Sequence, residues 1–294
     1  MPILPHKKLE SIISSLLEVT AIKLPTDVYA SLQKMRAEET QTLACELYSC
    51  IFDNLDKAEL LHRPLCQDTG VLQFFIRAGA HFPHLDILEE SIFTATKLAT
   101  ESVPLRHNTV ECFTEKNTGN NTGKLSPWIE WEIIPGDDLH IDVYMAGGGC
   151  SLPGRSKVLM PLEGYEGVAK FVFDTIVDWG VNACPPLVVG VGIGTCAATA
   201  AILSKKALLR KVGSVNANPQ AADMERMIKE GLDSIGIGPL GLTGTKSVQC
   251  VNIEFAGHHP ATLAVGVTVG CWATRRGSID ISADLASYAI TSHS

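Results

Sequence analysis

Hydrophobic residues follow two different spacings along the chain. Between Leu9 and Leu61 they recur every three or four positions, the period of an amphipathic helix. Pro25 interrupts this pattern, and Thr26 and Asp27 are suitable residues for capping a new helix. The pattern therefore predicts two or three helices that form a helical N-terminal layer over residues 1–62.

From residue 63 onward, short apolar runs alternate with Gly, Pro and Asn. Runs of strand character fall at residues 71–79, 128–134, 138–146, 186–194 and 263–271. Helical spacing returns at residues 167–180, 199–209 and 222–236. No linker, charge block or internal repeat divides the chain. We expect a single α/β domain over residues 1–294, with mixed β-sheets surrounded by helices and a core formed by residues 63–294.

Composition and charge exclude several classes of function. The chain has 294 residues, 46% of them hydrophobic, and a formal net charge of -8. A negative charge of this size argues against binding to nucleic acid or to an anionic membrane. The uncharged run Trp179–Ser204 contains two prolines and four glycines, which do not suit a membrane helix, and the N-terminus lacks the pattern of a signal peptide. We therefore expect a cytoplasmic protein without a membrane partner.

The nine cysteines do not form a disulfide pattern. Their number is odd, and no C-x-x-C pair occurs, so a metal site would have to gather ligands from distant segments. Cys66, Cys184 and Cys271 each stand at the end of a predicted element, where a thiolate can face a cleft. These three are candidates for a three-thiolate site, although a buried cysteine is more often a small hydrophobic residue.

Other segments carry candidate chemistry beside simpler explanations. Gln67 and Asp68 follow Cys66 directly, and Arg106 could bind a carboxylate. The three glycines at 147–149 permit close approach of the backbone to a ligand, or form a plain turn. The glycines at 190, 192 and 194 suggest a nucleotide site, but the third glycine of the fingerprint and its later acidic residue are missing.

Several motifs occur together and in order: CQDTG, PLRHN, NTGNNTG, AGGGCSLPGRSKVLMP, NACPP, GVGIG, GIGPLGLTG and GCWATRRG. In this order they resemble the α-subunit type of iron–sulfur hydro-lyase, the family of class I fumarases and L(+)-tartrate dehydratases. The similarity runs from about residue 60 to residue 280 and is weaker in the N-terminal helices. Cys150 stands where class I fumarases have serine, which favours the tartrate branch over a two-subunit fumarase.

The resemblance implies a specific site. Cys66, Cys184 and Cys271 would bind a 4Fe-4S cluster that leaves one iron open, so the enzyme would be oxygen-sensitive. Asp68 and His259 would be catalytic, and a small dicarboxylate would contact Gln67, Arg106, Gly148 and Gly149. A β subunit would supply the missing base, in an α2β2 assembly. From a different class, a non-catalytic nucleotide-binding or metal-binding module is the remaining alternative.

Overall fold

A computed structural model describes residues 4–294 of the chain. Its contacts divide the chain into two compact units. Unit 1 comprises Met1–Thr26, Asp53–Gly147 and Arg275–Ser294, and unit 2 comprises Asp27–Phe52 and Gly148–Thr274. The predicted single domain over residues 1–294 stays a prediction. No helix among the described residues combines the length and apolar character that crossing a membrane requires.

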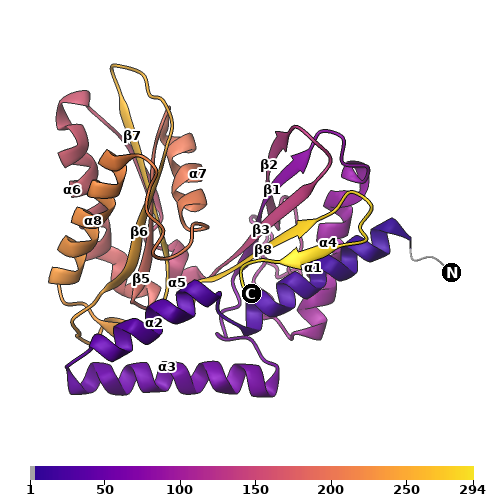
Figure 1. Cartoon of the computed structure of the whole chain (residues 1–294), viewed down its shortest axis with the longest axis horizontal. Coiled ribbons are helices and arrows are strands. Elements are labelled where there is room, and N and C mark those ends of the chain that lie inside the picture. Colours follow the sequence, from indigo (N-terminus) through magenta and orange to yellow (C-terminus); the bar gives the residue numbers. More distant parts are fainter. Residues whose placement is uncertain (1–3) are drawn as a thin grey trace. The chain divides into compact units, whose positions relative to one another are not determined.

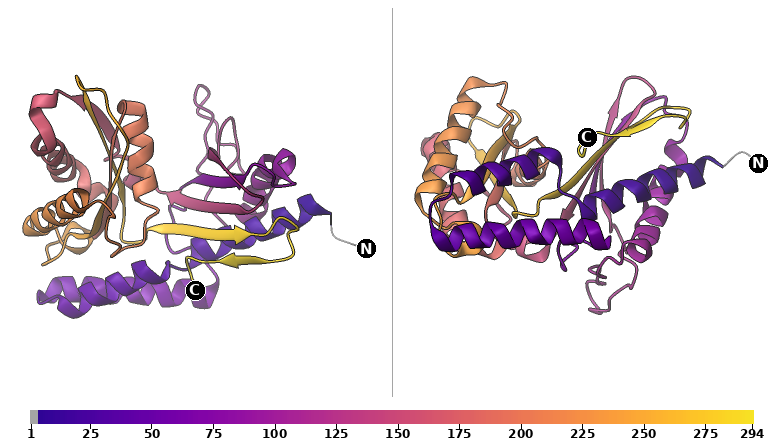
Figure 2. Two further views of the ribbon diagram at one scale, coloured as in Figure 1. Left: turned by 45° about the horizontal axis from the view of Figure 1, so that its top comes forward. Right: turned by 60° about the horizontal axis from the view of Figure 1, so that its bottom comes forward.

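Unit 1 is built on a five-stranded mixed sheet with the order β2-β1-β3-β8-β9. The strands are β1 (Val71–Gly79), β2 (Trp128–Ile134), β3 (Leu139–Ala146), β8 (Arg275–Ile281) and β9 (Tyr288–Ile290). Only the β1–β2 pair is parallel. Helices α1 (Pro5–Ile22) and α4 (Leu85–Ser102) pack on this sheet through a shared apolar core (Figure 1). Figure 2 shows the C-terminal strands, in yellow, completing the sheet.

Unit 2 contains a four-stranded mixed sheet with the order β4-β7-β5-β6. Its strands are β4 (Arg155–Leu159), β5 (Leu187–Gly194), β6 (Val248–Phe255) and β7 (Leu263–Gly270). Its main helices are α2 (Thr26–Glu38), the first part of α3 (Thr42–Leu61), α6 (Gly164–Trp179), α7 (Ala197–Ala207) and α8 (Pro219–Ser234). Short helical turns occur at α5 (Gly148–Ser151), η1 (Pro161–Glu163), η2 (Gly180–Ala183) and η3 (Pro239–Gly241).

The two faces of the unit 2 sheet are covered differently. Valine and isoleucine side chains on one face form a core with α6 and α8, and α7 packs on the other face (Figure 1). A Cβ atom at Gly190 or Gly192 would lie 2.2 Å or 2.0 Å from a backbone carbonyl oxygen of α7. These glycines lie within β5 and allow the helix to approach it closely. Their presence is thus explained by packing rather than by a nucleotide.

The predicted fold class is confirmed: the chain is mixed α/β with two mixed sheets and helices throughout its N-terminal region. The predicted strands and helices agree with the observed ones to within about three residues at their ends. The pattern did not predict α4, β4, β6, β8 or β9. Two of these, β6 and β8, contribute to the cores of their units.

Candidate active site

Three strand ends meet at one edge of the unit 1 sheet. β1 and β8 both run antiparallel to β3, so the first residues of β1 and β8 lie beside the last residues of β3. Val71 is opposite Ala146, and Met145 is opposite Arg275. The segment Cys66–Gly70 precedes β1, and Gly147 follows β3. The fold therefore brings segments that are far apart in the sequence to the same edge.

Asp68 is held at this edge and is half-buried. Its Oδ1 accepts hydrogen bonds from the Gly70 N–H at 3.1 Å and from the Asn108 Nδ2 at 3.2 Å. On the other side, a Cβ atom at Gly147 would lie only 2.9 Å from Oδ2. Glycine at position 147 leaves room for the carboxylate. A carboxylate fixed in this way and still reachable can exchange a proton with a bound molecule.

A buried amide network fixes the backbone of Arg106. The Arg106 carbonyl oxygen accepts hydrogen bonds from Thr69 Oγ1 at 3.2 Å and from Asn121 Nδ2 at 3.1 Å. Asn121 is 2% exposed, and its Oδ1 accepts a bond from the Asn108 N–H at 2.7 Å. Arg106 itself is exposed, as is Gln67. The Arg106 side chain thus extends from a backbone that hydrogen bonds hold in place.

The predicted cysteine ligands are divided between the two units. Cys66 belongs to unit 1, whereas Cys184 and Cys271 belong to unit 2. Within unit 2, the Trp272 N–H donates to the Cys184 carbonyl oxygen at 3.0 Å, which places these two cysteine segments side by side. None of the three thiols is buried, and none forms a disulfide. Among residues 4–294, no three His, Cys, Asp or Glu side chains are grouped for binding a single metal ion.

The predicted glycine contact lies in α5 of unit 2. A Cβ atom at Gly149 would lie 2.4 Å from the Asn182 carbonyl oxygen, two residues before Cys184. Cys150 follows and is buried. Burial lowers the pKa of Lys205 on α7, and an electrostatic interaction with Cys150 opposes this shift. Lys205, whose amine loses its proton more readily than usual, therefore interacts with Cys150, the residue that follows Gly149.

His259 occupies a different part of unit 2. It lies in the exposed loop before β7, and its Nδ1 accepts a hydrogen bond from the Ala261 N–H at 3.1 Å. Cys271 follows the other end of β7, and eight residues of strand span about 26 Å. Cys184 precedes β5 at the same end as Cys271. The fold of unit 2 does not bring His259 together with Cys184 and Cys271.

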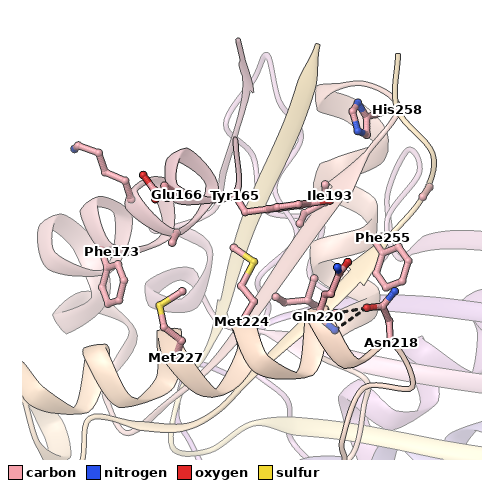
Figure 3. A pocket seen from close by; sticks show the side chains of 15 residues that line it. Tyr165, Glu166, Phe173, Ile193, Asn218, Gln220, Met224, Met227, Phe255 and His258 are labelled. Carbon is pink, nitrogen blue, oxygen red and sulfur yellow. Dashed lines mark hydrogen bonds between the residues drawn. The ribbon is translucent and has the colours of Figure 1, made fainter. Parts of the chain in front are cut away.

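An apolar groove of about 620 Å³ lies on the face of unit 2 that carries α6 and α8 (Figure 3). Phe173, Met224, Met227 and Phe255 are among its lining side chains. His258 also lines it, but none of the predicted site residues does. This groove is therefore separate from the polar candidate site.

Sequence reasoning missed several residues that shape the site. Asn108 and Asn121 appeared only as letters of the PLRHN and NTGNNTG motifs, and Arg275 only as one of two arginines after Cys271. Arg275 is 2% exposed, and its Nη2 donates to the Asp68 carbonyl oxygen at 2.7 Å. The recurrence of Asn between Gly119 and Gly123 was the available signal for Asn121, and no comparable signal marked Asn108. The contact made by Arg275 depends on strand order, which the sequence pattern does not specify.

A half-buried carboxylate that amide groups hold beside a glycine turn has the chemistry that proton transfer requires, and similarity to known proteins places the chain among the hydro-lyases. The chain belongs to the fumarate hydratase (Fumerase) family, which matches residues 10–280. It is 52% identical over 279 residues to the L(+)-tartrate dehydratase subunit alpha of Escherichia coli (strain K12), covering 95% of this chain and 92% of that protein. The subunit of the same name from Shigella sonnei (strain Ss046) has the same identity and coverage. A relative from Methanocaldococcus jannaschii is 38% identical over 281 residues, which is 94% of this chain and 99% of that one.

Proposed function

We propose that this chain is the α subunit of an L(+)-tartrate dehydratase. The reaction removes one C–H proton and one hydroxyl group from L-tartrate, and the resulting enol becomes oxaloacetate, so that one water leaves. The similarity of 52% over nearly the whole chain to proteins of that name carries this proposal. This similarity agrees with the presence of Cys150, where class I fumarases have serine, which favoured the tartrate branch over fumarase.

The proposal includes a 4Fe-4S cluster held by Cys66, Cys184 and Cys271. The donor set fits such a group, because three thiols that are neither buried nor disulfide-bonded stand at element ends, and thiolates suit iron. The ligands of a cluster bind separate irons and need not surround one ion. When bound, the cluster would supply an iron with an open position that acts as a Lewis acid. Cys150 and Cys250 are buried and are not part of the set.

The chain's own residues would bind and orient the substrate and move a proton. The guanidinium of Arg106 suits one carboxylate of tartrate, since it can donate two parallel hydrogen bonds. Gln67 and the backbone at Gly148 and Gly149 would contact the rest of the tartrate. Asp68 would donate a proton to the departing hydroxyl group. His259 was predicted to assist it, and this role stays a prediction. In unit 2, His259 lies at the opposite end of β7 from Cys271.

The relatives are named alpha subunits, which implies a partner chain. We propose that a β subunit provides the base for the C–H proton and the remaining cations, in an α2β2 assembly. Positioning supplies about 7–11 kcal/mol of barrier reduction in well-oriented systems, so an incomplete site should lose almost all turnover.

The test is anaerobic reconstitution of the cluster, followed by assays with L-tartrate and L-malate in the presence and absence of the β subunit. We expect tartrate turnover only with both chains, and a loss of at least about 100-fold in Asp68→Asn, in line with general acid catalysis. Asp86→Asn changes an exposed carboxylate of α4 and serves as the matched control. Turnover of malate in preference to tartrate would identify a two-subunit fumarase instead. Full tartrate turnover by the α chain alone would exclude the proposed β subunit.

A further inference from the structure

Arg275 makes an unusual contact for the first residue of a strand. Its side chain is among the largest that are fully buried, and it lies at the sheet edge that also carries Asp68. Its Nη2 donates a hydrogen bond to the Asp68 carbonyl oxygen at 2.7 Å. In the sheet order, β3 lies between β1 and β8, so this bond joins the segment before β1 to a strand that is not its neighbour.

The remaining donors of Arg275 are poorly satisfied. Its Nε and Nη1 have no hydrogen-bond partner among the described residues. A buried guanidinium is costly unless it is paired, and an apolar side chain of similar shape often serves stability as well or better. Buried polar groups without hydrogen-bond partners are expected where a residue serves function rather than stability. Among the described residues, the hydrogen bond that the Arg275 side chain makes is with the backbone of the predicted catalytic residue.

We propose that Arg275 is a positioning residue that sets the orientation of Asp68. This inference rests on the proposed function, in which Asp68 carries the proton. Asp68 is anchored at two points: Arg275 holds its carbonyl oxygen, while Asn108 and the Gly70 N–H hold its carboxylate. With both ends fixed, the side chain has one orientation. Without the hydrogen bond from Arg275, the peptide group that contains the Asp68 carbonyl oxygen could rotate. This rotation would move the Asp68 carboxylate away from its present position.

The first test needs neither cluster nor partner. Hydrogen exchange of a peptide covering residues 64–72 is measured in the unloaded chain for the wild type and for Arg275→Met. Ser278→Ala is the control, because it removes a polar side chain of the same strand that donates its hydrogen bond to Asp142 and not to the Asp68 segment. We expect at least about tenfold faster exchange in this peptide for Arg275→Met, as local opening becomes easier, and no change for Ser278→Ala.

The second test uses the reconstituted enzyme with its β subunit. We expect Arg275→Met to lower kcat per cluster by about 100-fold, the loss that a 1 Å misplacement can cause, with KM changed less than about threefold. Arg275→Lys keeps the positive charge and a hydrogen-bond donor group and should recover part of kcat. If Arg275→Met does not fold, both tests are performed with Arg275→Lys.

Three outcomes would overturn the inference: unchanged exchange in the folded variant, a KM that rises in step with the loss of kcat, or failure of both variants to fold. If the wild-type enzyme does not act on tartrate, the proposed function fails, and the exchange experiment still decides the role of Arg275.

Discussion

Replacing Gly147 by alanine tests whether the position of the Asp68 carboxylate controls turnover. The added Cβ would lie 2.9 Å from Asp68 Oδ2 and 3.3 Å from its Cγ. Ordinary contacts begin near 3.4 Å, so the carboxylate would have to move by about 0.5 Å. A catalytic group is effective only when held within about 0.5 Å of its productive position. Since 1 Å of misplacement can cost about 100-fold, we expect about a tenfold loss of kcat, which corresponds to about 1.4 kcal/mol of activation free energy.

The same substitution should hardly affect folding. Gly147 does not have a positive φ, and the atom that must move is the end of a side chain. Alanine at a permitted glycine position stabilises by about 0.4–1 kcal/mol through the unfolded state, so the free energy of unfolding should stay within about 1 kcal/mol of the wild type. Gly257→Ala is the control, because its Cβ would meet nothing within 4 Å.

A double-mutant cycle measures the coupling between the two positions. The assay compares kcat for the wild type, Gly147→Ala, Asp68→Asn and the double variant. If Gly147→Ala acts by displacing Asp68, its effect should be much smaller in the Asp68→Asn background. An equal loss of kcat in both backgrounds, or no loss in the single variant, would refute the reasoning.

The remaining predictions concern the ligands, the amide network and a titrating histidine. Cys66→Ser, Cys184→Ser and Cys271→Ser should each lose most of the iron and sulfide bound on reconstitution, whereas Cys112→Ser, at an exposed position, should not; equal iron contents would exclude the cluster assignment. Asn121→Ala removes the three hydrogen bonds of a buried side chain, worth about 1 kcal/mol each, so urea unfolding should show a loss of about 3 kcal/mol, and a loss below about 1 kcal/mol would contradict the network. The hydrogen bond from His140 to Asp142 raises the pKa of His140 above its ordinary 6.5, with a further contribution from Asp280. Its stabilisation is therefore fully present below that value and lost as the pH rises through the raised pKa. The urea midpoint of the wild type should fall between about pH 6 and pH 8.5 more than that of His140→Asn, and parallel decreases would assign the effect to other groups.

In unit 2, hydrophobic spacing predicted those strands whose residues are almost uniformly apolar. β5 and β7 are buried at every position, and their sequences contain few polar residues. β6 is also largely buried, but Gln249 and Asn252 interrupt its pattern. Their side chains donate to the backbone of neighbouring segments, at Pro186 and Ala207. Buried polar residues that donate to the backbone in this way conceal a strand from pattern reasoning.

Helix α4 was missed although its sequence carries a helical signal. Leu88, Ile92, Ala95 and Ala99 recur at spacings of three and four, and all are buried. Alanine and threonine on the same face weaken the apolar contrast, so the periodicity is less visible than in α1. β8 is a different case, since it begins with two arginines that are both buried. No propensity predicts a buried strand from such a start.

The site could be predicted only in part for a related reason. Cys66, Gln67 and Asp68 are consecutive and precede a predicted strand. This arrangement identified the segment as a candidate site from the sequence alone. The groups that hold Asp68 come from the loop before β2, the residue after β3 and the start of β8. Their convergence follows from the sheet order, which depends on how the whole chain pairs its strands. The sequence therefore indicated the chemistry but not the contacts that orient it.

The arrangement at this edge also bears on the proposed partner. Asp68 is fixed through its backbone and its carboxylate, and the Arg106 backbone is fixed by Thr69 and Asn121. The side chains of Gln67 and Arg106 nevertheless remain exposed. Holding a backbone rigid reduces the entropy lost when exposed side chains later bind. Such pre-organised but uncovered groups suit a site whose remaining surface comes from a second chain. A β subunit that shielded this edge from water would strengthen every charged contact there, so its absence should reduce turnover far more than any single substitution in the α chain.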